Sequence, residues 1–170
     1  MDLAYAINAM SRNRDRLHAL VRDLPDDLVR WKPAPKTWSI LEVMGHLLDE
    51  ERRDFRVRLE HLLFKPGVAW PPIDPEGWVT EHGYNTQDPK ATWRAFAEER
   101  ETSLAWLRGL RDPDWEAFWE HPRAGKLRAG DIMASWLAHD YLHMRQLVHL
   151  HVLHAGTMAT GYSTAYAGNW

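Results

Sequence analysis

Apolar residues recur at spacings of three and four along four long stretches of the chain, a pattern typical of amphipathic helices. The helices predicted in this way span about residues 3–24, 39–64, 88–110 and 131–154. None of these stretches shows the alternation of apolar and polar residues that indicates a half-buried strand. The pattern therefore predicts an all-α fold, a four-helix bundle with long connections.

Start and stop signals support these boundaries. Ser39 and Glu42 have the spacing of a capping box, and Asp88 followed by Pro89 is typical of a helix start. The start near residue 131 is less marked, because Arg128 stands where a small hydroxyl residue would be a better cap.

The connections between these helices are rich in proline. We expect an extended segment at 25–38, a loop at 65–87 with a short helix near 76–81, and a second short helix at 112–119. Residues 1–154 then form the bundle domain, and residues 155–170 form a C-terminal tail that either packs on the surface or is disordered.

Composition narrows the class of protein. A chain of 170 residues with 45% hydrophobic and 26% charged residues has the size and balance of one soluble domain. The net charge of −3, with basic and acidic residues interleaved, gives no reason to expect nucleic acid as a partner. The chain contains neither a long apolar span nor a signal-peptide pattern at its N-terminus, so we expect no membrane partner and a cytoplasmic location.

Histidine is the residue type that points to chemistry. The chain has 10 histidines and no cysteine, so a metal ion would be held by nitrogen and oxygen atoms. His139 and His143 lie four residues apart, which places both on one face of a helix. That face also carries Ile132, Trp136 and Leu150, so both imidazoles are expected to point inward, where a shared cation would use both of their lone pairs.

A third ligand would have to come from another helix, and His46 on the second helix is the best-placed candidate. It borders the predicted core, and Gly45 beside it would allow another backbone or a ligand to approach closely. A buried histidine can also be a hydrogen-bonded core residue, and spacing alone leaves both interpretations open. The other histidines are expected at the surface or at helix ends: His18, His61, His82, His121, His149, His151 and His154.

The motif H-D-Y-L-H also invites comparison with the zinc-protease motif H-E-x-x-H. Asp140 is one methylene shorter than the glutamate that serves as general base there, and Gln146 replaces the glycine of the extended motif. Without that glycine turn, His149 lies about 120° around the helix from His143 and cannot converge on the same ion. The sequence therefore disfavours a protease.

Three segments resemble the DinB-like superfamily of metal-binding four-helix bundles, which includes bacillithiol-transferase-like proteins and the mycothiol-dependent maleylpyruvate isomerase type. The segments are W-S-I-L-E-V-M-G-H-L (38–47), W-P-P-I-D-P-E-G-W (70–78) and H-D-Y-L-H-M-R-Q-L (139–147). The resemblance implies that His46, His139 and His143 bind one divalent transition-metal ion, nickel or zinc. It also implies a homodimer in many cases.

The resemblance suggests a metal-dependent transferase or isomerase that uses a low-molecular-weight thiol, with the electrophile in a pocket near Trp38, Trp70 and Trp136. Glu50, Asp140 and Gln146 could orient ligands or exchange protons, although Asp140 could equally be a solvated helix residue. The alternative is a non-catalytic metal-binding protein, acting in stress response or in binding a small molecule. No catalytic residue can be assigned from the sequence.

Overall fold

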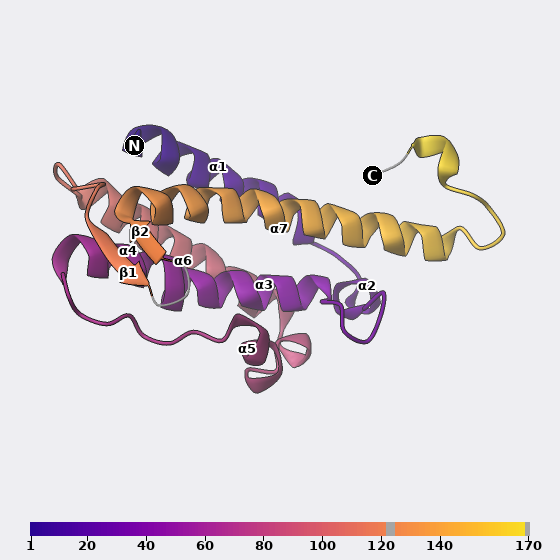
Figure 1. Ribbon diagram of the computed structural model, residues 1–170. Coiled ribbons are helices and arrows are strands. Elements are labelled where there is room, and N and C mark those ends of the chain that lie inside the picture. Colours follow the sequence, from indigo (N-terminus) through magenta and orange to yellow (C-terminus); the bar gives the residue numbers. More distant parts are fainter. Residues whose placement is uncertain (122–124, 169–170) are drawn as a thin grey trace.

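The computed structural model describes residues 1–121 and 125–168, and within them four long helical stretches pack as a bundle (Figure 1). The helices are α1 (Leu3–Val21), α2 (Asp26–Arg30), α3 (Ile40–Asp49), α4 (Arg56–Phe64), α5 (Pro75–Glu81), α6 (Pro89–Gly109) and α7 (Ala129–Met158). A π-helical segment, Glu50–Phe55, joins α3 to α4 into one continuous helix, and short 3-10 turns lie at Tyr84–Thr86 and Ala165–Ala167. The four-helix bundle predicted from the sequence is confirmed.

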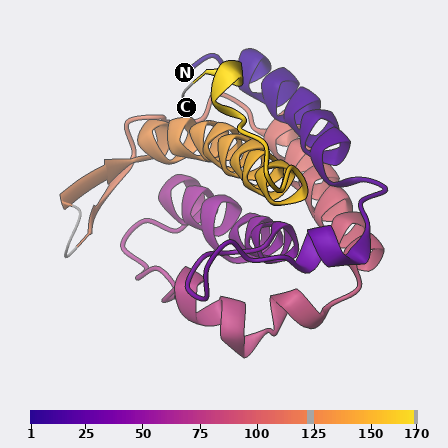
Figure 2. The ribbon, with the colours of Figure 1, turned by 90° about the vertical axis from the view of Figure 1, so that its right-hand side faces the viewer.

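The bundle has two pairs of parallel neighbours. Figure 1 shows α1 and α7 running in one direction, while the α3–α4 stretch and α6 run in the other. Helix α1 packs against α6 and α7, and α3 packs against the same two helices from the other side, as the end-on view in Figure 2 makes visible. None of the helices in the described part of the chain is long and apolar enough to cross a membrane.

Helix α3 is the central element of the fold. Each of its ten residues is buried, because α2, α5, α6 and α7 all pack around it. A helix buried on every side needs a firm start, and the predicted capping box supplies it. The Glu42 amide donates to Ser39 Oγ at 3.1 Å, and the Ser39 amide donates to Glu42 Oε2 at 2.7 Å.

The connections differ from the prediction in two places. The segment 25–38 is not extended throughout, since Asp26–Arg30 forms α2. The expected short helix at 112–119 is wrong: strand β1 (Phe118–His121) pairs antiparallel with β2 (Gly125–Arg128). In β1 the side chains alternate between exposed and half-buried, and Trp119 lies opposite Leu127, both packed against the apolar cluster at that end of the bundle. Side chains that alternate in burial at every second residue fit a pair of strands and not a helix.

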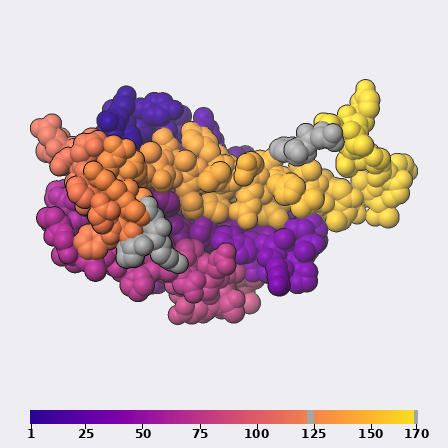
Figure 3. All heavy atoms as spheres, viewed as in Figure 1, coloured from indigo at the N-terminus to yellow at the C-terminus, as the bar shows by residue number. Residues whose placement is uncertain are grey.

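The last helix is longer than predicted at both ends. It begins at Ala129 rather than near residue 131, with Asp131 accepting a hydrogen bond from the Arg128 amide at 3.0 Å. It continues to Met158, into the segment that the sequence assigns to the tail. Figure 3 shows this end of α7 and the segment after it extending beyond the body of the molecule. Tyr162 and Tyr166 are exposed there, so the tail, as far as residue 168, does not pack on a surface groove of this chain.

Gly45 on α3 lies in close contact with a buried aromatic ring. A Cβ atom added there would lie 2.5 Å from Cγ of Tyr84, whose ring is buried. A close approach does occur at Gly45, but the neighbour is an aromatic side chain and not the backbone or ligand that the sequence predicts. We expect Gly45→Ala to lower the free energy of unfolding by about 1–3 kcal/mol, because the ring has no room to move. Urea unfolding measures the effect.

Gly109 provides the matched control for this substitution. It ends α6, and a Cβ atom there would meet nothing within 4 Å. Gly109→Ala is expected to leave stability unchanged or to raise it by up to about 1 kcal/mol, since alanine favours the helix. Equal effects of the two substitutions would show that the ring of Tyr84 does not restrict position 45.

Candidate metal centre

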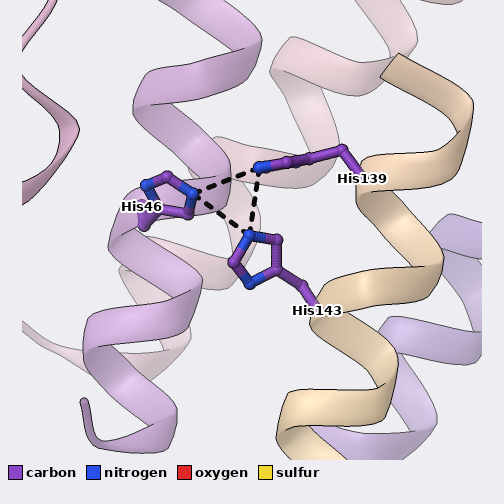
Figure 4. A group of neighbouring side chains, drawn as sticks. All are labelled: His46, His139 and His143. Atoms are coloured by element: carbon purple, nitrogen blue, oxygen red, sulfur yellow. Dashed lines mark hydrogen bonds between the residues drawn. The ribbon is translucent and has the colours of Figure 1, made fainter. Parts of the chain in front are cut away.

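The structure brings the three predicted histidines together in the interior of the bundle. The Nε2 atoms of His46, His139 and His143 lie 3.3, 3.1 and 3.0 Å from one another. Figure 4 shows the three rings directing these atoms at a common point, with His46 on α3 facing the other two on α7. His139 and His143 meet because a spacing of four stacks side chains on one helix face.

The surroundings hold the three rings in place. His46 is only 5% exposed. The ring of Trp38 packs on His46 with centroids 4.8 Å apart, and the ring of Phe55 packs on His139 at 5.0 Å. Aromatic contacts of this kind restrict rotation of the imidazoles and exclude water from their flanks.

Neighbouring polar groups influence which ring nitrogens carry protons. Nδ1 of His143 lies 2.8 Å from Oε1 of Gln146, an acceptor, so the proton of His143 belongs on Nδ1 and its Nε2 offers a lone pair. Nδ1 of His46 and Oε1 of Glu50 face each other at 3.8 Å, and both atoms are buried without a hydrogen-bond partner among the described residues. This arrangement is suited to a carboxylate that orients a ligand histidine.

All three imidazoles are expected to be neutral. Burial lowers the pKa of His46 to about 3, with a further contribution from His143 and opposition from Asp49. Burial also lowers the pKa of His139 to about 2, helped by His143, His46 and Arg100. For His143, burial lowers the pKa against the opposing effects of Gln146 and Asp140. Neutral imidazoles are the form that binds metal ions.

The three nitrogen atoms fit a single transition-metal ion. Nitrogen ligands about 2.0–2.1 Å from one ion, at angles between octahedral and tetrahedral, lie about 2.9–3.4 Å apart. The observed separations of 3.0 to 3.3 Å fall inside that range. With the proton of each ring on Nδ1, the three Nε2 lone pairs would face one another without a mutual hydrogen bond, whereas a shared cation would use all three. These residues can therefore hold a metal ion.

The π-helical segment places two consecutive glutamates in different buried environments. Glu50 is directed at His46, while Glu51 contacts the interior on the other side of the helix, and their side chains are 6% and 2% exposed. Burial raises the pKa of Glu50 to about 7, against the effect of Arg58 and with the help of Asp49. Segments of π-helix are rare and are frequent at functional sites.

A buried ionic network lies directly behind the histidine cluster. Arg100 on α6 donates to both carboxylate oxygens of Glu51, at 2.9 and 3.0 Å, and to both of Asp140, at 2.8 Å each. Nε1 of Trp136 donates to Glu51 at 3.0 Å, and the amide of Asn13 donates to Asp140 at 3.2 Å. The network connects α1, the π-helical segment, α6 and α7, and Asp140 is the direct neighbour of His139 in the chain.

A second polar group lies on the α5 side of α3. Asp49 accepts hydrogen bonds from the Tyr84 hydroxyl at 2.6 Å, from Nδ1 of His82 at 2.6 Å and from Arg53 at 2.9 Å. Burial would raise the pKa of Asp49, but these hydrogen bonds outweigh it and the pKa is lowered. His82 lies at the C-terminal end of α5, consistent with the helix-end position predicted from the sequence, and its half-buried ring takes part in this hydrogen-bonded group.

Other predicted residues have mixed outcomes. Asp140 is 1% exposed and paired with Arg100, so the interpretation of a solvated helix residue is wrong. Trp38 lies at the cluster as expected, whereas Trp136 faces Glu51 and Trp70 packs under the guanidinium of Arg58 at 4.6 Å. Reasoning from the sequence missed Arg100, although a charged residue midway between Phe96 and Leu104 on an apolar stripe was a usable signal.

Comparison with known proteins agrees with this geometry. The model of the DinB superfamily matches residues 9–147. The chain belongs to the DinB superfamily. This DinB-superfamily protein is similar to a solved structure, YfiT from Bacillus subtilis, described as a probable metal-dependent hydrolase with an unusual four-helix bundle topology. The match has a TM-score of 0.77 at 19% identity and covers 95% of this chain and 89% of that one, so it establishes the shared fold. No curated protein matches the chain.

The lowered pKa values predict how metal-free protein responds to acid. Unfolded imidazoles bind protons near their ordinary pKa of 6.5, while folded His46 and His139 stay neutral, so stability falls as the pH drops below 6.5. The raised pKa of Glu50 acts in the opposite sense between 4.5 and about 7 and offsets roughly one of these two imidazoles. We expect a net loss of about 1.4 kcal/mol per pH unit between pH 6 and 5, to which the lowered pKa of His143 adds in the same direction.

Urea unfolding in the presence of a chelator at the two pH values measures this slope. Replacing His139 by Gln removes one of the depressed groups and should reduce the slope by about 1.4 kcal/mol per pH unit. A slope that is unchanged in the His139→Gln variant would contradict the assignment of His139 as a buried neutral imidazole.

Proposed function

We propose that the protein is a metal-dependent enzyme in which His46, His139 and His143 bind one divalent transition-metal ion that activates a small nucleophile. The observation that carries the proposal is the convergence of three neutral imidazole nitrogens, from one buried and two half-buried histidines, within 3.3 Å of one another. Three protein ligands leave coordination positions for water or substrate, as in catalytic rather than structural sites. Nickel and zinc both suit an all-imidazole site.

Two nucleophiles are compatible with this site. A bound ion of this kind lowers the pKa of a coordinated water or thiol and polarises carbonyl groups. The sequence contains no cysteine, so a thiol would have to arrive as a low-molecular-weight substrate, which corresponds to a transferase or isomerase. The similarity to YfiT, a probable metal-dependent hydrolase, supports water as the second candidate.

Residues next to the three histidines would orient the imidazole rings and set which ring nitrogen carries the proton. The side-chain oxygen of Gln146 accepts a hydrogen bond from Nδ1–H of His143. This bond favours the tautomer in which Nε2 is free to bind the ion. Glu50 is placed to accept the Nδ1 proton of His46 in the same way, since the two atoms face each other at 3.8 Å without other partners among the described residues. Trp38 and Phe55 cover the ring faces and keep water from the flanks of the site.

Metal analysis tests the site before any substrate is known. Purified protein reconstituted with nickel or zinc and then desalted is expected to hold about one ion per chain, and His143→Ala should hold much less than one. His149→Ala is the matched control, because His149 lies on the same helix, is exposed and is outside the cluster. Equal metal content in the two variants would contradict the site.

A turnover assay then separates the candidate reactions. Metal-loaded protein is incubated with a panel of esters and amides, and separately with cellular thiols and electrophiles, in parallel with His139→Ala. Hydrolysis without thiol that is lost in the variant indicates a hydrolase, and a rate that requires a thiol indicates a transferase or isomerase. A fully loaded protein without activity in either panel would overturn the enzyme proposal in favour of non-catalytic metal binding.

A further inference from the structure

A cavity of about 700 Å³ opens at the end of the bundle where α1 leads into α2, the end that faces the viewer in Figure 2. It lies between the last turn of α1, α2 and the first turns of α6 and shares no residue with the histidine cluster. Met44 on its floor and His46 are two residues apart on α3, so their side chains point in directions roughly 160° apart. The cavity is therefore separate from the candidate metal centre.

The floor and one wall of the cavity are apolar. Val21, Val29 and Met44 form the floor and are 7%, 1% and 4% exposed. Trp93 forms a wall, and its ring stacks on His18 with centroids 4.6 Å apart and planes within 7°. A volume of about 300–1,000 Å³ with apolar and aromatic lining is typical of small-molecule sites.

A small void extends the floor toward the interior. It has a volume of about 10 Å³, is lined by apolar side chains alone, and shares Val21, Met44 and Trp93 with the cavity. Methionine is unbranched and flexible, so a shift of Met44 would let the apolar end of a ligand reach further inward. The shape thus favours a ligand with an apolar body that enters end-on.

The mouth of the cavity carries an excess of positive charge. Three exposed cations line it, none with an ion pair among the described residues: Arg22, Lys90 and Arg94. Three carboxylates also line it. Asp26 forms an ion pair with Arg30 at 2.9 Å, whereas Asp23 and Asp88 keep their charge, although Asp88 accepts the Ala91 amide at 2.7 Å. Three cations therefore face two unpaired carboxylates, which leaves an excess of one positive charge at the mouth.

We propose that this cavity binds a small monocarboxylate with an apolar body, the hydrocarbon on the floor of Val21, Val29 and Met44 and the carboxylate at Lys90 and Arg94. An aliphatic and an aromatic acid share this chemistry. Charge at the rim fixes the orientation of the ligand, because a carboxylate on the apolar floor would lose its hydration without a partner. The site is independent of the metal ion and of the reaction proposed for it.

The test uses metal-loaded protein labelled with ¹³C at its methionine methyl groups. There are six methionines, and the Met44→Leu variant assigns the signal of Met44. Dodecanoate, an aliphatic acid, and 2-naphthoate, an aromatic one, are titrated below the concentrations at which they aggregate. We expect at least one of them to shift the Met44 signal in a saturable manner, and dodecylammonium to bind at least tenfold more weakly than dodecanoate if dodecanoate is the ligand.

Charge reversal at the mouth is the matched perturbation. Lys90→Glu with Arg94→Glu should weaken binding at least tenfold, whereas Arg12→Glu with Arg108→Glu changes the net charge equally at exposed positions outside the cavity and should leave it unchanged. The proposal is overturned if neither acid shifts the Met44 signal or if both double variants bind alike. It is also overturned if the signal shifts with protein concentration alone, which would indicate a second copy of the chain in the cavity.

Discussion

Replacing Arg100 by alanine is expected to lower the free energy of unfolding by about 3–5 kcal/mol, a large share of the roughly 5–15 kcal/mol that stabilises a typical domain. The side chain is 1% exposed and holds Glu51 and Asp140 by two bidentate pairs. Without it, two carboxylates remain buried with no opposite charge between them, and an uncompensated buried charge is among the largest single destabilising effects. Urea unfolding at pH 7 measures the loss.

Two controls separate the loss of charge balance from the loss of a side chain. Arg108→Ala removes an exposed arginine from the same helix and should change stability by no more than about 0.5 kcal/mol. A triple variant, Arg100→Met with Glu51→Gln and Asp140→Asn, removes all three charges and should recover at least half of the loss. If the triple variant were as unstable as Arg100→Ala, the lost packing of the arginine side chain, and not the unbalanced buried charge, would explain the loss of stability.

Adding nickel or zinc to metal-free protein is expected to stabilise it by about 4 kcal/mol when the free ion is at a thousand times its Kd, because the folded state alone presents the three imidazoles together. For a chain of this size the melting temperature should rise by roughly 8–16 °C. Calorimetry with and without the ion measures the shift.

The variant His46→Ala removes the one ligand that α3 contributes and should lose most of this shift. His149→Ala, which lies outside the cluster, should retain it. A stabilisation that survives in His46→Ala would mean that the ion binds elsewhere, and it would contradict the proposed triad directly.

The sequence predicts the local features of the fold well. The capping box at Ser39 is found where expected, and so is the start of α6 at Asp88, because both depend on residues three apart in the chain. The inward direction of His139 and His143 follows from helical spacing in the same way. His46 is different: its position in the sequence favoured a core residue over a ligand, and only the resemblance to a family selected it as a ligand.

The features that the sequence does not predict depend on contacts between distant segments. The hairpin at 118–128 forms because Trp119 and Leu127 find an apolar cluster to cover, which no local pattern indicates. The π-helical turn is another case, since within it Glu50 is directed at His46 while the next residue, Glu51, pairs with Arg100, which is 49 residues away in the chain. Asp140 looked solvated in the sequence because its partner Arg100 is forty residues away.

The ionic network has a kinetic consequence for metal uptake. Glu50 and Glu51 are consecutive residues, as are His139 and Asp140, and in each pair one side chain faces the histidine cluster while the other is held by Arg100. The backbone at residues 50–51 and 139–140 is therefore ordered before an ion binds. The entropy cost of ordering it belongs to folding and not to metal binding. Uptake should then be a single bimolecular step whose rate follows ion dehydration and access, and an ion whose radius does not suit the fixed separation of the imidazoles should bind weakly rather than reshape them.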